Sequence, residues 1–252
     1  MPQLAERVSL LPANRVIGEV VDRLTTIEHD LDGFFYPAGG GPAARRERRP
    51  LPDGVACFNG MYLEVTRAVR DALPTFESRA FVERLDVLFA EFYFQAFDAA
   101  AAHAWVSKAW APLFERKDAS DVLALQFALA GMNAHINNDL AHALVLTWRE
   151  LDLEPARDTP EYRDYERVNA ILERVEGEIK GPLSDRLVTE VDTLLGTADD
   201  VLALWSIRRA REEAWRRARI MRAAPDAELD GLFDRFVGFA GHLLLRQTIL
   251  AG

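Results

Sequence analysis

A group of polar residues interrupts an otherwise apolar segment near the middle of the chain. His135, Asp139 and His142 follow one another at steps of four and three, so on a helix they share one stripe. Two imidazoles and a carboxylate on one face could ligate a divalent metal such as zinc or iron, with further ligands from facing helices. Without a metal, His135 would act as an acid or a base and Asp139 would orient it. We therefore predict His135 and Asp139 as catalytic, and a metal set of these two with His142 if a metal binds.

Amide side chains surround the same stripe. Asn133, Asn137 and Asn138 lie within the run from residue 133 to residue 139. Such amides can hold a carbonyl group or a developing oxyanion, so we predict that they bind the substrate. A buried amide costs about 1–3 kcal/mol if it stays unpaired, and a buried carboxylate costs more. The alternative is structural, with a simple pair between His135 and Asp139 and with asparagines that cross-link neighbouring helices.

Further candidates lie on an aromatic segment at about residues 85–97, which we expect to supply an apolar pocket wall. Glu91 has aromatic neighbours on both sides, which favours partial burial. Asp86 and Tyr93 are seven residues apart and share a helical face. We predict all three in the substrate site. A surface salt bridge is the alternative for either acid.

A second set of charges lies between two tryptophans. Trp205, Arg208, Glu212 and Trp215 form one helical stripe. Because tryptophans usually bury, Arg208 and Glu212 could be drawn inward and paired, and the guanidinium could hold a carboxylate ligand. We include both residues as substrate-binding candidates. A solvated charged face is the alternative.

The usual signatures of several enzyme classes are missing from the sequence. It contains no GxGxxG, no P-loop and no CxxC, so we expect neither a nucleotide cofactor nor structural zinc. No Glu-x-x-His motif supports a di-iron bundle. No serine or cysteine has a nucleophile-elbow context.

The polar group must be positioned by a buried helix. Between residues 122 and 148 the only formally charged side chain is Asp139, and a helix that is apolar all round is normally covered on every side. A membrane span is the competing interpretation, but the polar run interrupts its middle. We therefore predict one central buried helix over about residues 121–148.

The rest of the chain predicts helices that surround this one. Apolar spacing and the positions of proline and glycine indicate helices at about 13–30, 55–73, 162–179, 185–195, 199–222 and 226–250. No run of strands is evident. The expected fold is all-α, a single compact multi-helix bundle over residues 1–252, with a mobile loop at about 37–53.

Composition limits the expected binding partners and the expected cellular compartment. The 252 residues carry a formal net charge of −10, which argues against general binding to nucleic acid or to anionic membranes. A single cysteine, Cys57, permits no internal disulfide, and no secretory signal is evident, so we expect a cytoplasmic protein. The oligomeric state stays open.

The run Gly131-Met-Asn-Ala-His-Ile-Asn-Asn-Asp-Leu140 resembles the signature of an uncharacterised helical family, a domain of unknown function common in actinobacteria. Shorter pieces are similar too, among them Trp110 with Phe114 and the Arg-Glu-x-x-Trp segment that ends at Trp215. His142 lies outside the signature. The resemblance covers most of the chain and implies an all-helical single domain, with no established activity.

Together these observations predict an enzyme that transforms a small molecule, in the specialised metabolism of an actinobacterium. Acid–base or metal-assisted cyclisation, dehydration or hydrolysis would suit the His/Asp/Asn group. The alternative is a non-catalytic protein that binds an amphipathic small molecule.

Overall fold

The structure is a computed structural model, and it describes residues 15–31, 53–191 and 207–246, with the backbone alone over 176–191. Within these ranges all regular structure is helical. The first part of the chain forms α2 (Ile17–Asp30), α3 (Gly54–Ala72), the short 3₁₀ helix η2 (Leu73–Thr75), α4 (Arg79–Ala101) and α5 (Ala111–Arg116). The second part forms α6 (Ala124–Met132), η3 (Asn133–Asp139), α7 (Leu140–Glu150), α8 (Pro160–Val191), α10 (Ile207–Ala223) and α11 (Ala227–Leu244). The predicted all-α fold is confirmed.

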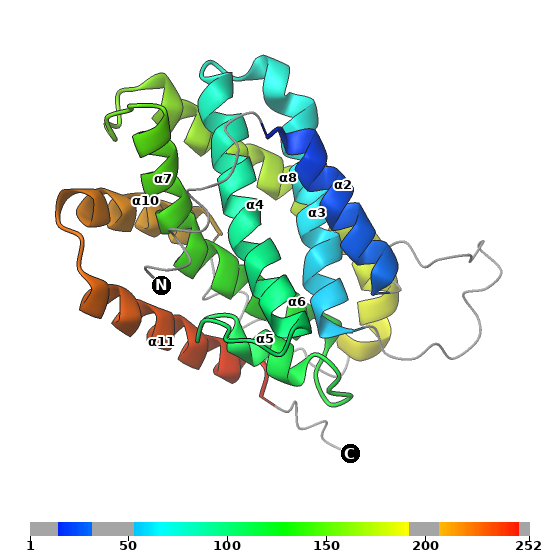
Figure 1. The fold of residues 1–252 in the computed structure, drawn as a ribbon. Helices are drawn as coiled ribbons and strands as arrows, with labels where there is room; N and C mark the ends of the chain where they lie inside the picture. The colour runs from blue at the N-terminus through cyan, green and yellow to red at the C-terminus, as the bar shows by residue number, and fades with distance from the viewer. Residues whose placement is uncertain (1–14, 32–52, 192–206, 247–252) are drawn as a thin grey trace.

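The helices pack as a bundle around α4 and the continuous run α6–η3–α7. Figure 1 shows α4 in the middle of the view, with α3 and α2 on one side of it and α7 on the other. The carboxyl-terminal helices α10 and α11 contact η3, and α11 crosses the end of the bundle near α5. The segment η3 is therefore enclosed by helices from both halves of the chain.

Two hydrophobic cores lie on either side of this segment. One core joins α4, α7, α8 and α10 and includes Trp148 and Trp215, while the other joins α2, α3, α4 and α5 and includes Phe58 and Trp110. The residues of η3 contribute to both cores, through Ile136 in the first and Ala134 in the second. The polar residues of η3 thus lie between two apolar clusters.

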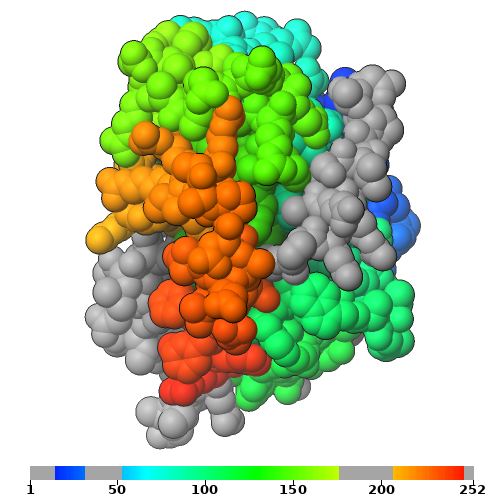
Figure 2. All heavy atoms as spheres, turned by 60° about the vertical axis from the view of Figure 1, so that its left-hand side comes forward, coloured from blue at the N-terminus to red at the C-terminus, as the bar shows by residue number. Residues whose placement is uncertain are grey.

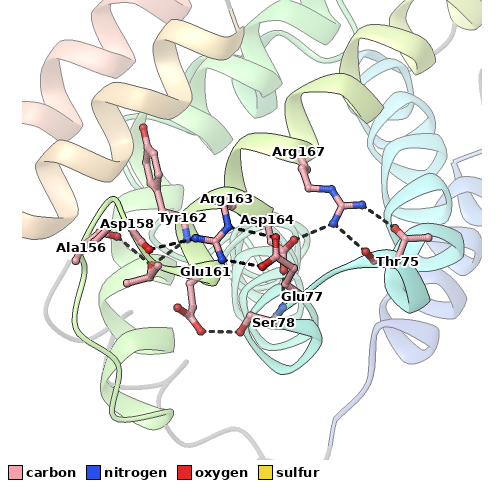
Figure 3. Close-up of polar contacts among 11 residues, drawn as sticks. Thr75, Glu77, Ser78, Ala156, Asp158, Glu161, Tyr162, Arg163, Asp164 and Arg167 are labelled. Atoms are coloured by element: carbon pink, nitrogen blue, oxygen red, sulfur yellow. Dashed lines mark hydrogen bonds and ion pairs between the residues drawn. The ribbon is translucent and has the colours of Figure 1, made fainter.

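The start of α4 is fixed by a polar network with the start of α8 (Figure 3). The buried Asp164 carboxylate accepts a hydrogen bond from the backbone N–H of Ser78, the residue before α4. Arg163 pairs with Glu77 at 2.7 Å, and Arg167 donates to the carbonyl of Thr75 at 2.8 Å. Because the first N–H groups of a helix have no partner inside it, this carboxylate fixes the start of α4, the helix that carries the aromatic segment at 85–97.

The central helix is present but is not a uniform α-helix. In place of one helix over 121–148, the chain forms α6, then the π-helix η3, then α7. A π-helical turn holds more residues than an α-helical turn, so the residues that follow it leave the register that a three-and-four spacing assumes. The predicted location of the buried segment is confirmed, while its regular helical register is wrong.

One predicted helix break is absent, and two predicted segments lie partly or almost entirely outside the described residues. The break expected near residue 180 is absent, because α8 continues through Gly181 and Pro182 to Val191; a proline removes one backbone hydrogen bond without always ending a helix. The loop at 37–53 falls almost entirely outside the described residues, as does the first part of the helix expected at 199–222. None of the helices in the described ranges is both long and apolar enough to cross a membrane.

Candidate functional site

Hydrogen bonds with α10 and α11 stabilise the wide turn of the π-helix η3. Asn133 donates from Nδ2 to the carbonyl of Val237 on α11 at 2.9 Å. Arg217 on α10 donates from Nη1 to the carbonyl of Asn137 at 3.1 Å. Asn137 in turn donates to Oδ1 of Asn133 at 3.0 Å. π-helical turns inside α-helices are rare and occur frequently at functional sites, so this geometry marks the same segment that composition singled out.

Asp139 is the centre of the polar group. Its side chain is completely buried and accepts from three donors in the described part of the chain. Trp110 Nε1 donates to Oδ2 at 2.9 Å, and Asn138 Nδ2 donates to Oδ1 at 2.9 Å. His135 Nδ1 lies 3.2 Å from the same Oδ2. Several donors around one carboxylate fix its orientation.

The imidazole of His135 is oriented by this carboxylate. A carboxylate only accepts, so the neutral ring carries its proton on Nδ1 and has a lone pair on Nε2. Nε2 is buried and has no hydrogen-bond partner among the described residues. Burial lowers the pKa of His135, and the hydrogen bond and charge of Asp139 oppose that effect. The ring is therefore a neutral base, with its basic nitrogen unused.

Aromatic rings enclose His135. Phe89 of α4 stacks on the imidazole, with ring centroids 3.5 Å apart and planes 6° from parallel. Tyr62 of α3 meets it edge to face at 4.7 Å. Phe58, Tyr93 and Trp110 lie between 5.8 and 6.3 Å from it. Five aromatic residues around one imidazole make an apolar surrounding in which a proton-transferring group acts without competition from bulk water.

Two more ionisable groups reach this aromatic region. The Tyr62 hydroxyl and Oδ2 of Asp86 are both buried without a hydrogen-bond partner in the described ranges. Burial raises the pKa of Asp86 to about 8, with a further contribution from the charge of Glu83. Burial and then the charge of Asp86 raise the pKa of Tyr62 well above its usual value, and the Thr66 hydroxyl partly offsets them. At neutral pH both groups are thus proton donors.

Asn138 and His142 lie toward the other side of the segment. Oδ1 of Asn138 and Nε2 of His142 are buried without partners among the described residues. Burial and then the positive charge of Arg217 lower the pKa of His142 to about 4, against the opposing charges of Asp230 and Asp139. His142 therefore lies close to charged groups of α10 and α11, while its ring is 5.9 Å from that of Phe92 on α4.

The predicted metal set is not assembled. Across the described residues, no three side chains of His, Cys, Asp or Glu are grouped as a metal ion requires. His135 and Asp139 pair with each other, but His142 does not join them. The wide π-helical turn rotates His142 away from the stripe that α-helical spacing predicts.

The remaining candidates on α4 have structural partners. Tyr93 is buried and its hydroxyl donates to Oδ1 of Asn59 at 3.2 Å, while its ring lies in the aromatic group around His135. Glu91 is partly buried, as expected, but it pairs with Arg15 at 2.8 Å. The structure thus places Asp86 close enough to Tyr62 to act on its hydroxyl, and it places the Tyr93 ring near His135. It places Glu91 in a contact with Arg15, which precedes α2.

Arg208 and Glu212 are not drawn into the site. The Arg208 side chain is 56 % exposed and pairs with Glu173 and Glu166 of α8. Glu212 accepts from the Tyr162 hydroxyl at 2.9 Å and from Arg157. Trp215 is fully buried, but Trp205 lies outside the described residues. A single buried tryptophan does not force the neighbouring charges inward, since long side chains reach solvent from the edge of an apolar face.

Sequence reasoning missed three residues of the site. Trp110 was noted only as part of a family resemblance, although it is the donor that holds Asp139. Phe89 is predicted only as part of the apolar wall at about residues 85–97 and Tyr62 is not singled out, yet they are the rings nearest to His135. A tyrosine within an apolar stripe was the one available signal, because a buried hydroxyl requires a partner.

Most of the chain matches the model of one protein family. The model of a family of unknown function, DUF5995, matches residues 17–247, so the chain belongs to that family. Searches of curated proteins and of solved structures gave no match.

Proposed function

We propose that the protein is an enzyme that transforms a small neutral molecule by acid–base chemistry at His135. One observation carries the proposal: the Asp139 carboxylate orients the imidazole through Nδ1, and the buried basic Nε2 is left without a partner in an aromatic surrounding. A structural histidine would normally satisfy both nitrogens, since an unpaired buried polar atom costs about 1–3 kcal/mol.

The chemistry follows from the protonation states. His135 is neutral and can accept a proton, while Asp86 and Tyr62 are protonated and can donate one. A base and two acids around one apolar region suit a dehydration or a cyclisation. In a dehydration, His135 Nε2 would remove a proton from carbon and Asp86 would protonate the departing hydroxyl. The C–H and C–O bonds break, a C=C bond forms and water leaves.

The surrounding residues suit a substrate without negative charge. All rings in contact with His135 are aromatic and uncharged, and the nearby ionisable groups, Asp86 and Asp139, are acids. An anionic substrate would be repelled by Asp139 and would keep no hydration there. We therefore propose an apolar or aromatic molecule that carries a hydroxyl or a carbonyl group. Because His135, Asp139 and His142 do not gather as ligands, the acid–base version is favoured over the metal-assisted one.

The experiment compares wild-type protein with His135→Gln in a small-molecule extract of the source cells, followed by mass spectrometry. Glutamine keeps polarity and a similar reach but cannot accept a proton. We expect one compound to disappear with the wild type alone, and a product of equal mass or a mass lower by one water to appear. If the wild type retains a compound without converting it, the protein is a binding protein and the enzymatic proposal is wrong.

A matched control is Glu91→Gln. Glu91 is an acid on the same helix as Asp86, but it is paired with Arg15 and is not part of the proposed chemistry. It should keep turnover, while Asp86→Asn should reduce it. Equal turnover in His135→Gln and wild type would overturn the assignment of the base.

A further inference from the structure

Nonpolar side chains cover the outer face of α11. They lie at steps of three, four and one, and each is between 38 % and 69 % exposed: Leu229, Leu232, Phe233, Phe236, Phe239 and Leu243, here called the α11 stripe. Figure 2 shows α11 in orange-red at the surface of the molecule. A helix in an isolated globular protein normally presents charged or polar residues on that face.

The opposite face of α11 is firmly attached to the bundle, so the stripe cannot be buried by a simple rotation of the helix. Asp234 accepts from the backbone N–H groups of Lys108 and Ala109 at 3.1 and 2.9 Å. A Cβ atom at Gly238 would lie 2.1 Å from the Lys108 carbonyl oxygen, which shows how closely the backbones approach. Because the opposite face of α11 is held against Lys108 and Ala109, the α11 stripe faces away from the bundle.

The exposed area has the size of a dimer interface. Taking about 200 Å² for a fully exposed phenylalanine and somewhat less for leucine, the stripe exposes roughly 500 Å² of apolar surface. A standard interface buries about 800 Å² on each partner, and homodimer interfaces are about 65 % apolar, which again gives roughly 500 Å².

The charges on α11 favour a second copy in the antiparallel direction. The helix begins with Asp226, Glu228 and Asp230 and ends with His242 and Arg246. Phe236, the most exposed residue of the stripe, lies midway between Asp226 and Arg246. A two-fold axis at Phe236 places the acidic start of each helix beside the basic end of the other. A parallel arrangement would place like charges side by side.

We infer that the α11 stripe is the interface of a symmetric homodimer in which two α11 helices pack antiparallel around Phe236. The same surface on both subunits is self-complementary in shape and charge, as a two-fold interface requires. This inference does not depend on the proposed reaction.

The test is the mass of the full-length protein in solution, by sedimentation velocity over the micromolar range, for wild type and Phe236→Glu. We expect the wild type to sediment as a dimer and Phe236→Glu as a monomer, because the variant brings two like charges together at the axis. Since the Phe236 side chain is already 69 % exposed, the monomer should keep its helical circular dichroism. The matched control is Ile220→Glu, at an apolar residue of α10 that is 58 % exposed, and this variant should remain dimeric.

The antiparallel direction has its own test. Glu228→Arg and Arg246→Glu should each weaken the dimer severalfold, and the double variant should recover wild-type affinity. Recovery is expected only if the two residues meet across the interface. A monomeric wild type, a dimeric Phe236→Glu, or wild-type protein that instead binds to lipid vesicles would overturn the inference.

Discussion

The indole Nε1 of Trp110 and the carboxylate of Asp139 meet at 2.9 Å inside the bundle, on the same oxygen that faces His135. Trp110 comes from the segment before α5, while Asp139 ends the π-helix. Both side chains are completely buried. The hydrogen bond therefore ties the loop between α4 and α5 to the group that orients the proposed base.

Trp110→Phe should weaken this arrangement in two measurable ways. The Asp139 carboxylate loses one of its three donors, which should destabilise the protein by about 1.5–3 kcal/mol beyond the lost packing. The negative charge is then less compensated, so the pKa of His135 should rise relative to wild type. Urea unfolding and an NMR titration of His135 measure the two effects.

Trp148→Phe is the control for that substitution. Trp148 is equally buried, but its Nε1 has no hydrogen-bond partner in the described part of the chain. The control loses packing alone and should leave the titration of His135 unchanged. Equal losses of stability in the two variants would contradict a special role for the Trp110 indole.

Asp86→Asn should change how stability depends on pH. Burial raises the pKa of Asp86 to about 8 in the folded protein, whereas an unfolded carboxyl ionises near 4. Between these values the folded state holds a proton that the unfolded state has lost, so stability falls as pH rises, by at most about 1.4 kcal/mol per pH unit. Asp86→Asn removes this slope and should be more stable than wild type at about pH 8.

The measurement is urea unfolding at several pH values from about 5 to 8. Asp118→Asn, an acid with a 78 % exposed side chain, is the control and should follow the wild-type curve. A wild-type curve that is unaffected by Asp86→Asn would show that the carboxyl is ionised in the folded protein.

His142→Gln should change how the stability of the protein depends on pH below about 6.5. The pKa of His142 is lowered to about 4 in the folded protein, from 6.5. Between these values the imidazole is protonated in the unfolded state and unprotonated in the folded state. The wild-type free energy of unfolding therefore falls as pH drops from 6.5 toward 4. His142→Gln should reduce that loss, as measured by thermal unfolding between about pH 4 and pH 6.5. His29→Gln, at a 76 % exposed position, should not.

Gly131→Ala should loosen the site through packing. A Cβ atom at Gly131 would lie 2.4 Å from Cγ of Phe58, whose ring contacts His135 and Trp110. Overpacking of this kind typically costs about 1–3 kcal/mol. Gly18→Ala on α2 meets nothing closer than 4.0 Å and should instead stabilise the protein by up to about 1 kcal/mol. Thermal unfolding of the two variants, with opposite shifts of Tm, checks this prediction.

Sequence patterns predicted the fold well because burial leaves a direct mark on residue type. The stretch around Asp139 has no other formally charged side chain, and that absence alone located the segment between the two cores. Helix bounds such as Ile17–Asp30 and Gly54–Ala72 follow from apolar spacing with an error of at most about one turn. The burial pattern and the helix bounds depend on residues that are close together in the sequence, so they can be predicted from it.

The site was predictable only in part, since it is built from contacts distant in the chain. His135 and Asp139 are four residues apart and their pairing was foreseen. The donation from Trp110, 29 residues away, and the stacking of Phe89 depend on how helices pack. Arg208 shows the opposite error, in which a local pattern suggested burial that the packing does not provide.

The π-helix also means that η3 contains more residues than an α-helix of the same length would hold. Its two flanking helices are fixed independently, α6 against α3 and α7 against α4 and α10. Removing one residue, such as the half-buried Asn137, would let the segment close into an ordinary α-helix while α6 and α7 keep their places. The proposed chemistry and the helical architecture that supports it are in this sense separable by a one-residue deletion.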